Sequence, residues 1–221
     1  MSILAKIFKK KEKISNIENQ EILIQTPIQN KRILIVSDIH FPLNEKEQEM
    51  LKENFDICLL LGDIPKDVLQ SIDTNNKCKF YGIYGNHDTN DMYNDIKNLK
   101  YIHRHCVIEE DETSIIGISG SSKYKKSSSY CMFSQEEILD ITKNMRKVDI
   151  LISHDSPYQI HSTSKNKEGF KGITEYIKKN KPKLHLYGHH HITKAYMIDE
   201  TLCICNYRLG IIEKNGMYHT I

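Results

Sequence analysis

Six short apolar runs, separated by longer polar segments, constrain the fold of this chain more than any other feature of its sequence. Each run is continuously apolar and does not alternate with polar residues, which is typical of strands buried on both faces. Polar segments of helical length between such strands favour helices that cover the faces of a sheet. The pattern therefore predicts a layered α/β fold. The runs are ILIV (33–36), ICLLL (57–61), FYGIY (80–84), SIIGIS (114–119), DILIS (149–153) and LHLY (184–187).

The polar segments carry signals for helix starts and, later in the chain, for a hairpin. Two of them open with the spacing of a capping box, in which a cap residue and a glutamate three residues later satisfy each other's backbone N–H groups. A third helix, over residues 172–180, must end near Pro182. Beyond residue 195 short strands and the pair Asn215-Gly216 indicate antiparallel hairpins. The capping-box pairs are Asn44 with Glu47 and Ser134 with Glu137.

Composition is that of an ordinary soluble globular protein, with 39% hydrophobic and 27% charged residues. The net charge of +2 produces no global field toward nucleic acid or membrane, which argues against a dedicated nucleic-acid-binding module. The six cysteines are scattered without a CxxC pair and no signal peptide precedes them, so we expect a reduced, cytoplasmic setting. No apolar run reaches the roughly 18 residues of a membrane-spanning helix.

Residues 1–30 differ in kind from the rest, so we expect a polar N-terminal tail followed by one domain over residues 31–221. Between residues 3 and 13, apolar side chains at helical spacing are flanked by lysines. Such a segment can lie on an anionic membrane surface or dock to a partner. For so short a stretch we favour the alternative, a frayed or locally packed tail.

Aspartate, asparagine and histidine, residue types that can bind metal ions, follow five of the six apolar runs. Because ligand sites of open α/β sheets form at the carboxyl ends of the strands, we expect these side chains to meet at one edge. In extended backbone, residues two apart point the same way, so His189 and His191 should face the site while His190 points elsewhere. The predicted ligands are Asp38, His40, Asp63, Asn86, His154, His189 and His191.

Seven ligands are more than one tetrahedral ion uses, but they suit two ions that share a carboxylate. Oxygen and imidazole donors without thiolate favour first-row divalent metals. Two such ions about 3.5 to 4 Å apart form a clamp for in-line displacement at phosphorus. Taken singly, Asp63 or Asn86 is more often a turn residue and His154 a satisfied polar group, but the ordered set argues against those interpretations.

The ordered set resembles the calcineurin-like metallophosphoesterases, whose pattern is DxH, GD, GNH[DE], an isolated histidine and GHxH. This sequence has all five blocks in that order between residues 33 and 191. The resemblance implies a four-layer αββα sandwich of two mixed β-sheets flanked by helices, with the metal site at the C-terminal strand ends. The blocks are Asp38-Ile39-His40, Gly62-Asp63, Gly85-Asn86-His87-Asp88, His154 and Gly188-His189-His190-His191.

The resemblance also implies roles for these residues. A hydroxide bridging two metal ions would attack phosphorus, with His87 as the acid for the leaving oxygen and Asp88 orienting its ring. Mn²⁺ is the metal we expect first, with Fe, Zn, Ni or Co as alternatives. One ion would bind Asp38, His40 and His191, the other would bind Asn86, His154 and His189, and Asp63 would bridge both.

Departures from the family pattern narrow the range of expected substrate classes. The sequence lacks the arginine of the GDxVDRG block, which argues against a protein phosphatase and leaves a phosphodiesterase for small esters such as cyclic nucleotides. Lys123 or Tyr124, in the loop after a central strand, is a candidate substrate contact. The alternatives are a DNA or RNA nuclease of the same superfamily, which the near-neutral charge does not favour, and a non-catalytic scaffold. The oligomeric state is left open.

Overall fold

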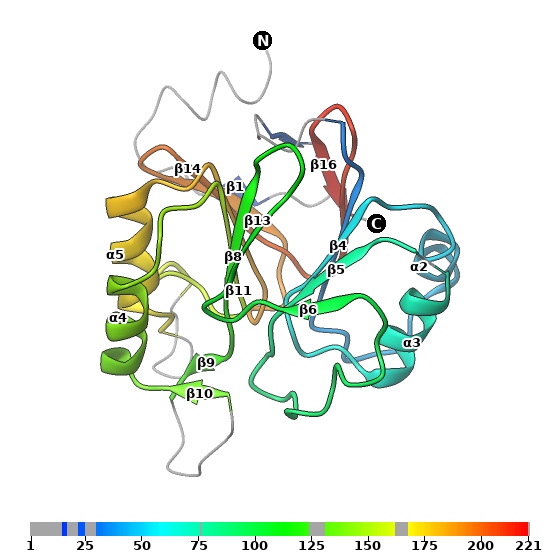
Figure 1. Ribbon diagram of the computed structural model, residues 1–221, viewed down its shortest axis with the longest axis horizontal. Helices are drawn as coiled ribbons and strands as arrows, with labels where there is room; N and C mark the ends of the chain where they lie inside the picture. Colours follow the sequence, from blue (N-terminus) through cyan, green and yellow to red (C-terminus); the bar gives the residue numbers. More distant parts are fainter. Residues whose placement is uncertain are drawn as a thin grey trace.

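The computed structural model describes residues 15–16, 22–24, 30–75, 77–123, 131–161 and 168–220. Within these, two seven-stranded sheets face each other (Figure 1). The β3 sheet has the order β2 (Ile22–Leu23), β16 (Met217–Thr220), β15 (Arg208–Ile212), β3 (Ile33–Ser37), β4 (Ile57–Leu60), β5 (Lys79–Gly82) and β6 (Leu99–Tyr101). The β12 sheet has the order β1 (Ser15–Asn16), β13 (Lys194–Ile198), β14 (Thr201–Cys205), β12 (Leu184–Tyr187), β11 (Ile150–Ser153), β8 (Ser114–Ile118) and β7 (Cys106–Ile108).

Both sheets are mixed, and their parallel parts set the position of the candidate site. Strands β3, β4, β5 and β6 run parallel, as do β8, β11, β12 and β14, while the flanking strands pair antiparallel. The carboxyl ends of parallel strands meet at one edge of their sheet. A short parallel pair, β9 (Ser121–Ser122) with β10 (Met132–Phe133), extends from that edge.

Helices cover the outer face of each sheet, giving the four layers predicted from the sequence (Figure 1). Adjacent residues of one strand enter different cores: Leu59 packs between the two sheets, and Leu60 packs toward the helices of the β3 sheet. This explains why the runs are continuously apolar, since both faces of each strand are buried. The helices are α2 (Glu45–Met50) and α3 (Lys66–Asn75) on the β3 sheet, and α4 (Gln135–Lys143) and α5 (Lys171–Asn180) on the β12 sheet.

Local signals in the sequence are found where they were expected. Both capping boxes are formed, at Asn44 before α2 and at Ser134 before α4. Helix α5 ends at Asn180, and its cap residue Lys181 adopts a left-handed backbone directly before Pro182. The β15–β16 hairpin turns through Gly216, whose φ of 83° favours glycine.

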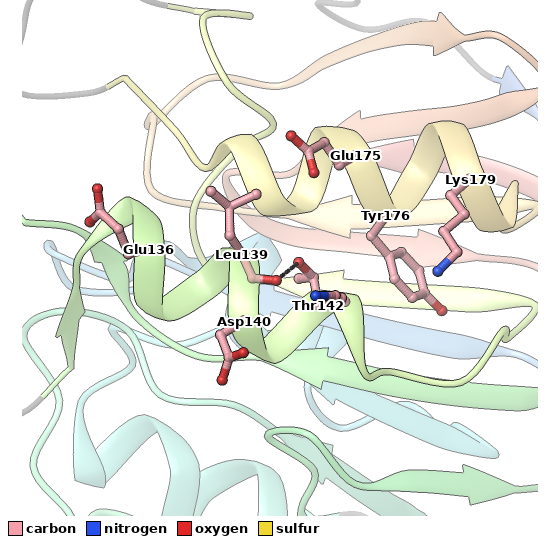
Figure 2. A pocket seen from close by; sticks show the side chains of 8 residues that line it. Glu136, Leu139, Asp140, Thr142, Glu175, Tyr176 and Lys179 are labelled. Carbon is pink, nitrogen blue, oxygen red and sulfur yellow. Dashed lines mark hydrogen bonds between the residues drawn. The ribbon is translucent and has the colours of Figure 1, made fainter.

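The outer helices of the β12 sheet enclose a hollow of about 530 Å³ between them (Figure 2). Its lining comes from α4 and α5 alone, and none of the predicted ligands belongs to it. At its centre Thr142 donates a hydrogen bond to the carbonyl of Leu139. The hollow is therefore separate from the strand ends.

Two pieces of the segment expected to be a tail form edge strands. Strand β1 pairs with Lys194 and Ala195 of β13, and β2 pairs with Met217 and Tyr218 of β16. The amphipathic stretch at residues 3–13 lies outside the described residues, and the domain boundary at residue 30 stays a prediction. In the part of the chain that the structure describes, no helix is both long and apolar enough to cross a membrane.

Candidate metal centre

The loops that carry the predicted ligands leave their strands in an unusual backbone conformation. Asp38, Asp63, His189 and His191 all have positive φ, at 52°, 54°, 67° and 53°. The extended backbone expected for His189 and His191 is therefore wrong, because the chain reverses sharply as it leaves the strand. Left-handed conformations of residues other than glycine cost about 1–3 kcal/mol each, and they persist only where surrounding contacts hold them.

Two glycines allow these loops to approach closely. Gly62 has a φ of 94°, and a Cβ there would lie 2.1 Å from the backbone nitrogen of Gly85. A Cβ on Gly188 would lie 2.3 Å from a carboxylate oxygen of Asp38. The glycines that precede Asp63 and His189 are thus required by contact between neighbouring strand ends.

The first predicted ion site brings three ligands together. The Nε2 atoms of His40 and His191 lie 2.9 Å apart, and Asp38 Oδ1 lies 3.9 Å from the first and 3.5 Å from the second. These donor atoms all fall within 4.8 Å of one another. Tyr207 supports the cluster from outside, since its ring stacks on His191 with centroids 5.5 Å apart.

Asp38 joins the two sheets as well as contributing to the site. Its Oδ2 atom accepts hydrogen bonds from the Ser37 hydroxyl and from the backbone N–H of His189, the latter at 2.8 Å. Burial raises the pKa of this carboxyl, but His191, His154 and Ser37 outweigh burial and lower it below its usual value. Asp38 is therefore held ionised, with its second oxygen directed at the ligand cluster.

The second predicted site is assembled around a buried histidine. His154 Nδ1 lies 2.8 Å from the carbonyl of Leu61, which assigns the N–H to that atom and leaves Nε2 as the donor for a cation. That Nε2 lies 3.1 Å from Asn86 Oδ1 and 3.4 Å from Asp63 Oδ2. The ring of His189 lies 5.1 Å from that of His154. The structure thus brings Asp63, Asn86, His154 and His189 close together, and their role as ligands of one ion stays a prediction.

The electrostatics of this cluster favour a cation. Burial raises the pKa of Asp63, but the charge and hydrogen bond of His154 and the N–H of His87 lower it below its usual value. Burial opposes protonation of His154, yet Asp63 and Asp38 raise its pKa to about 10. The raised pKa of His154 reports the negative charge of two carboxylates in a dry site, and the lowered pKa of Asp63 reports its pairing with the His154 cation.

The sequence comparison accounts for this arrangement. The model of the calcineurin-like phosphoesterase family matches residues 31–193. The chain belongs to the calcineurin-like phosphoesterase family. As a metallophosphoesterase it is a hydrolase of phosphate esters. No curated protein matches its sequence.

Solved structures resemble this phosphoesterase in fold. The protein TT1561 of Thermus thermophilus is 14% identical with a TM-score of 0.60, covering 87% of this chain and 99% of its own. The phosphopantetheinyl hydrolase PptH of Mycobacterium tuberculosis is 13% identical with a TM-score of 0.52, covering 80% and 89%. A structure described as a novel archaeal phosphodiesterase is 16% identical with a TM-score of 0.50, covering 86% and 98%. At these identities the similarity shows the shared fold alone.

The residues present fit the divalent metals typical of the family. Asp38 Oδ1 is buried and accepts no hydrogen bond from any described residue. Two imidazole nitrogens converge beside it, and imidazole with carboxylate suits first-row divalent ions. Two groups of acidic and histidine side chains, which share Asp38, are close enough to hold an ion: Asp38 with His40 and His191, and Asp38 with Asp63 and His154.

His87 and Asp88 occupy the positions next to the ligands but contact different partners. His87 is exposed, its N–H donates to Asp63 Oδ1 at 2.9 Å, and its ring lies 6.4 Å from that of His40. In the described chain no hydrogen bond joins Asp88 to the His87 ring. Asp88 Oδ2 instead accepts the N–H groups of Asp63 and Gly85, at 2.8 and 2.7 Å. Burial and the charge of Asp63 raise its pKa to about 6.

Sequence reasoning missed an ion pair that holds the loop after His40. Arg208 donates two hydrogen bonds to the nearly buried carboxylate of Glu47, at 2.6 and 2.7 Å. The same guanidinium donates to the carbonyls of Phe41 and Pro42, at 3.1 and 3.0 Å. The sequence could have indicated this ion pair only indirectly. Arg208 is the first residue of β15, which pairs antiparallel with β3, and its contact with Phe41 follows from that pairing.

The loop expected to contact substrate is described in part. Lys123 is exposed, and its N–H donates to the carbonyl of Phe133 at 2.9 Å. Tyr124 lies outside the described residues. Substrate contact by Lys123 stays a prediction.

Proposed function

We propose that this phosphoesterase uses two divalent cations, Mn²⁺ first among them, to hydrolyse small phosphodiesters. The observation that carries the proposal is the convergence of the His40 and His191 Nε2 atoms, 2.9 Å apart, on the Oδ1 of Asp38, which accepts no hydrogen bond from any described residue. The first ion would bind these three residues, Asn86, His154 and His189 would bind the second, and Asp63 would bridge them. When bound, the ions supply Lewis acidity, an acidic water and compensation for phosphate charge.

The chain's own groups would divide the remaining work. The N–H of His87 donates to the Asp63 carboxylate and the Asp63 N–H donates to Asp88, so hydrogen bonds hold both the side chain and the backbone of Asp63. The exposed ring of His87, next to the proposed ligand Asn86 in sequence, would give a proton to the leaving oxygen. An imidazole can both donate and accept a proton, which suits this role.

Apolar side chains beside the first ion site favour an ester with an aromatic or nucleoside group. Phe41 is 68% exposed and directly follows His40, while Ile192 is 40% exposed and directly follows His191. Arg208 donates a hydrogen bond to the backbone carbonyl of Phe41 and so holds the backbone that carries the exposed ring. A planar group stacked on such a ring gains about 1–3 kcal/mol. Cyclic nucleotides combine that group with a diester.

The test is hydrolysis by metal-stripped protein to which single metals are returned. The substrates are p-nitrophenyl phosphate, bis(p-nitrophenyl) phosphate, 2′,3′-cyclic AMP and a single-stranded oligonucleotide. We expect Mn²⁺-dependent turnover of the two small diesters, faster than that of the monoester. Cleavage of the oligonucleotide alone would support the nuclease alternative. Absence of turnover with Mn²⁺, Fe²⁺, Zn²⁺, Ni²⁺ and Co²⁺ would contradict the proposal.

A further inference from the structure

The third histidine of the GHHH block faces a buried carboxylate behind the metal centre. The side chain of His190 is 3% exposed, that of Asp155 is fully buried, and His190 Nε2 lies 3.5 Å from Asp155 Oδ1. Asp155 follows the ligand His154, and His190 stands between the ligands His189 and His191. The expectation that His190 points away from the ions agrees with this placement. Its ring has a buried carboxylate as its neighbour.

Asp155 connects three neighbouring strand ends. Its Oδ2 accepts the N–H of Ser122, at 2.9 Å, from the segment that follows β8. Its Oδ1 accepts the N–H of Ser156, at 2.8 Å, and faces His190 in the loop after β12. One buried carboxylate therefore contacts the loops after β8, β11 and β12.

His190 also lies between two residues with left-handed backbone, in a turn that depends on surrounding contacts. The residues on either side of it, His189 and His191, both adopt left-handed conformations, with φ of 67° and 53°. Its N–H donates to the carbonyl of Gly188 at 2.8 Å, and its ring packs on that of His161 with centroids 4.6 Å apart. A strained turn of this kind persists only if surrounding contacts determine it.

We propose that Asp155 and His190 form a positioning pair that holds His189 and His154 in the geometry needed by the second ion. The proposal rests on the proposed function in that it takes these two residues as metal ligands. The pair touches no ion itself, and it acts by fixing the two loops from which the ligands project. Contacts that orient metal ligands from behind typically change metal affinity about 10- to 100-fold when they are lost.

Two substitutions at the same position separate positioning from packing. His190→Phe keeps a planar ring against His161 but removes the nitrogen that faces Asp155. His190→Gln restores an N–H donor near the position of Nε2. The matched control is His185→Phe, because His185 is equally buried in the adjoining strand β12 and contacts Ser153 Oγ at 2.7 Å.

Mn²⁺ titration calorimetry of the metal-stripped proteins gives the first readout, and urea unfolding gives the second. We expect His190→Phe to lower the affinity for one of the two Mn²⁺ ions about 10- to 100-fold. His190→Gln should recover most of that affinity. His185→Phe should lower the unfolding free energy without changing either affinity. Wild-type affinities in His190→Phe, or equal weakening in His185→Phe, would overturn the proposal.

Amide hydrogen exchange of the metal-free proteins separates this proposal from the proposed function. In His190→Phe the amides of residues 188–192 should exchange about 10-fold faster, a local loss of some 1.4 kcal/mol of protection, and His190→Gln should restore them. If the wild-type protein binds no first-row divalent cation, the proposed function fails. The exchange measurement still decides the role of the pair, because unchanged protection in His190→Phe would exclude it.

Discussion

The Nε2 atoms of His40 and His191 lie 2.9 Å apart although 151 residues separate them in the chain. His40 follows a strand of one sheet and His191 follows a strand of the other. Two imidazoles at this distance can share at most one hydrogen bond, whereas a cation between them would bind both. The short distance therefore supports the position proposed for the first ion.

Removal of His191 should abolish one of two metal sites. We expect His191→Ala to bind one Mn²⁺ in place of two, because Asp38 and His40 alone are insufficient to hold an ion tightly. His105→Ala is the control, since His105 is exposed and belongs to neither ligand group. Metal content measured by mass spectrometry after dialysis checks the difference. Retention of two ions by His191→Ala would show that this histidine is no ligand.

His87→Ala should separate chemistry from metal binding. The ring lies beside the ligands without joining either group of metal-binding side chains, so both ions should stay bound. Loss of a general acid typically lowers turnover about 10²- to 10⁴-fold. The measurement is the turnover number of bis(p-nitrophenyl) phosphate together with metal content. A parallel loss of metal would mean that His87 supports a ligand.

Arg208→Met should destabilise the fold and the first ion site together. It leaves the buried Glu47 carboxylate without its partner, and losses of this kind cost about 3 kcal/mol. Urea unfolding of the single variant and of Glu47→Gln with Arg208→Met checks the cause. The double variant should regain part of the lost stability, because it removes the unpaired charge. Equal instability of the two variants would contradict this explanation.

A tryptophan in place of Phe41 can report on the proposed aromatic contact. The chain has no tryptophan, so Phe41→Trp introduces a single fluorophore. We expect adenosine monophosphate to quench it in the Mn²⁺-loaded protein and inorganic phosphate to leave it nearly unchanged. Ile108→Trp is the control, because Ile108 is 58% exposed but pairs with Ser114, at the opposite end of β8 from the site. Equal responses to the two ligands would exclude stacking at Phe41.

Acid should weaken the fold through His185. Burial lowers the pKa of this histidine to about 3, so it is neutral in the folded protein and protonated on unfolding below about pH 6.5. The contribution of neutral His185 to the unfolding free energy is complete above about pH 6.5 and is lost as the pH falls toward 3. Between pH 6.5 and 4.5 the loss is about 2 kcal/mol. Urea unfolding with chelator should show a correspondingly flatter pH dependence in His185→Gln.

Much of the fold could be predicted because its signals are local. Each of the six apolar runs is a strand, and both capping boxes open helices. Helix α3 was missed although Pro65 precedes its first residue, since no cap side chain marks it. Strands β6, β7, β9 and β10 were missed because two or three residues are too short for a pattern to emerge.

The predicted ligands converge, but the reason for their orientation could not be read from the sequence. Alternation in an extended strand suggested that His189 and His191 share a face. In the structure both residues instead have a left-handed backbone, and this conformation directs their side chains toward the site. Asp155 is the second residue after β11, next to the predicted ligand His154, yet only the packing of β12 beside β11 brings His190 to it. Contacts between distant segments carry no local signature.

The hydrogen bond from the His189 N–H to Asp38 has a consequence for the order in which the protein is made. Asp38, His40, Asp63 and Asn86 come from the β3 sheet, and the remaining ligands come from the β12 sheet. The last of the proposed ligands, His191, lies 151 residues after His40 in the chain. On the proposed ligand set, the metal-binding cluster would therefore form only after strands of both sheets have been synthesised and packed together, so cation binding would report the docking of the two sheets.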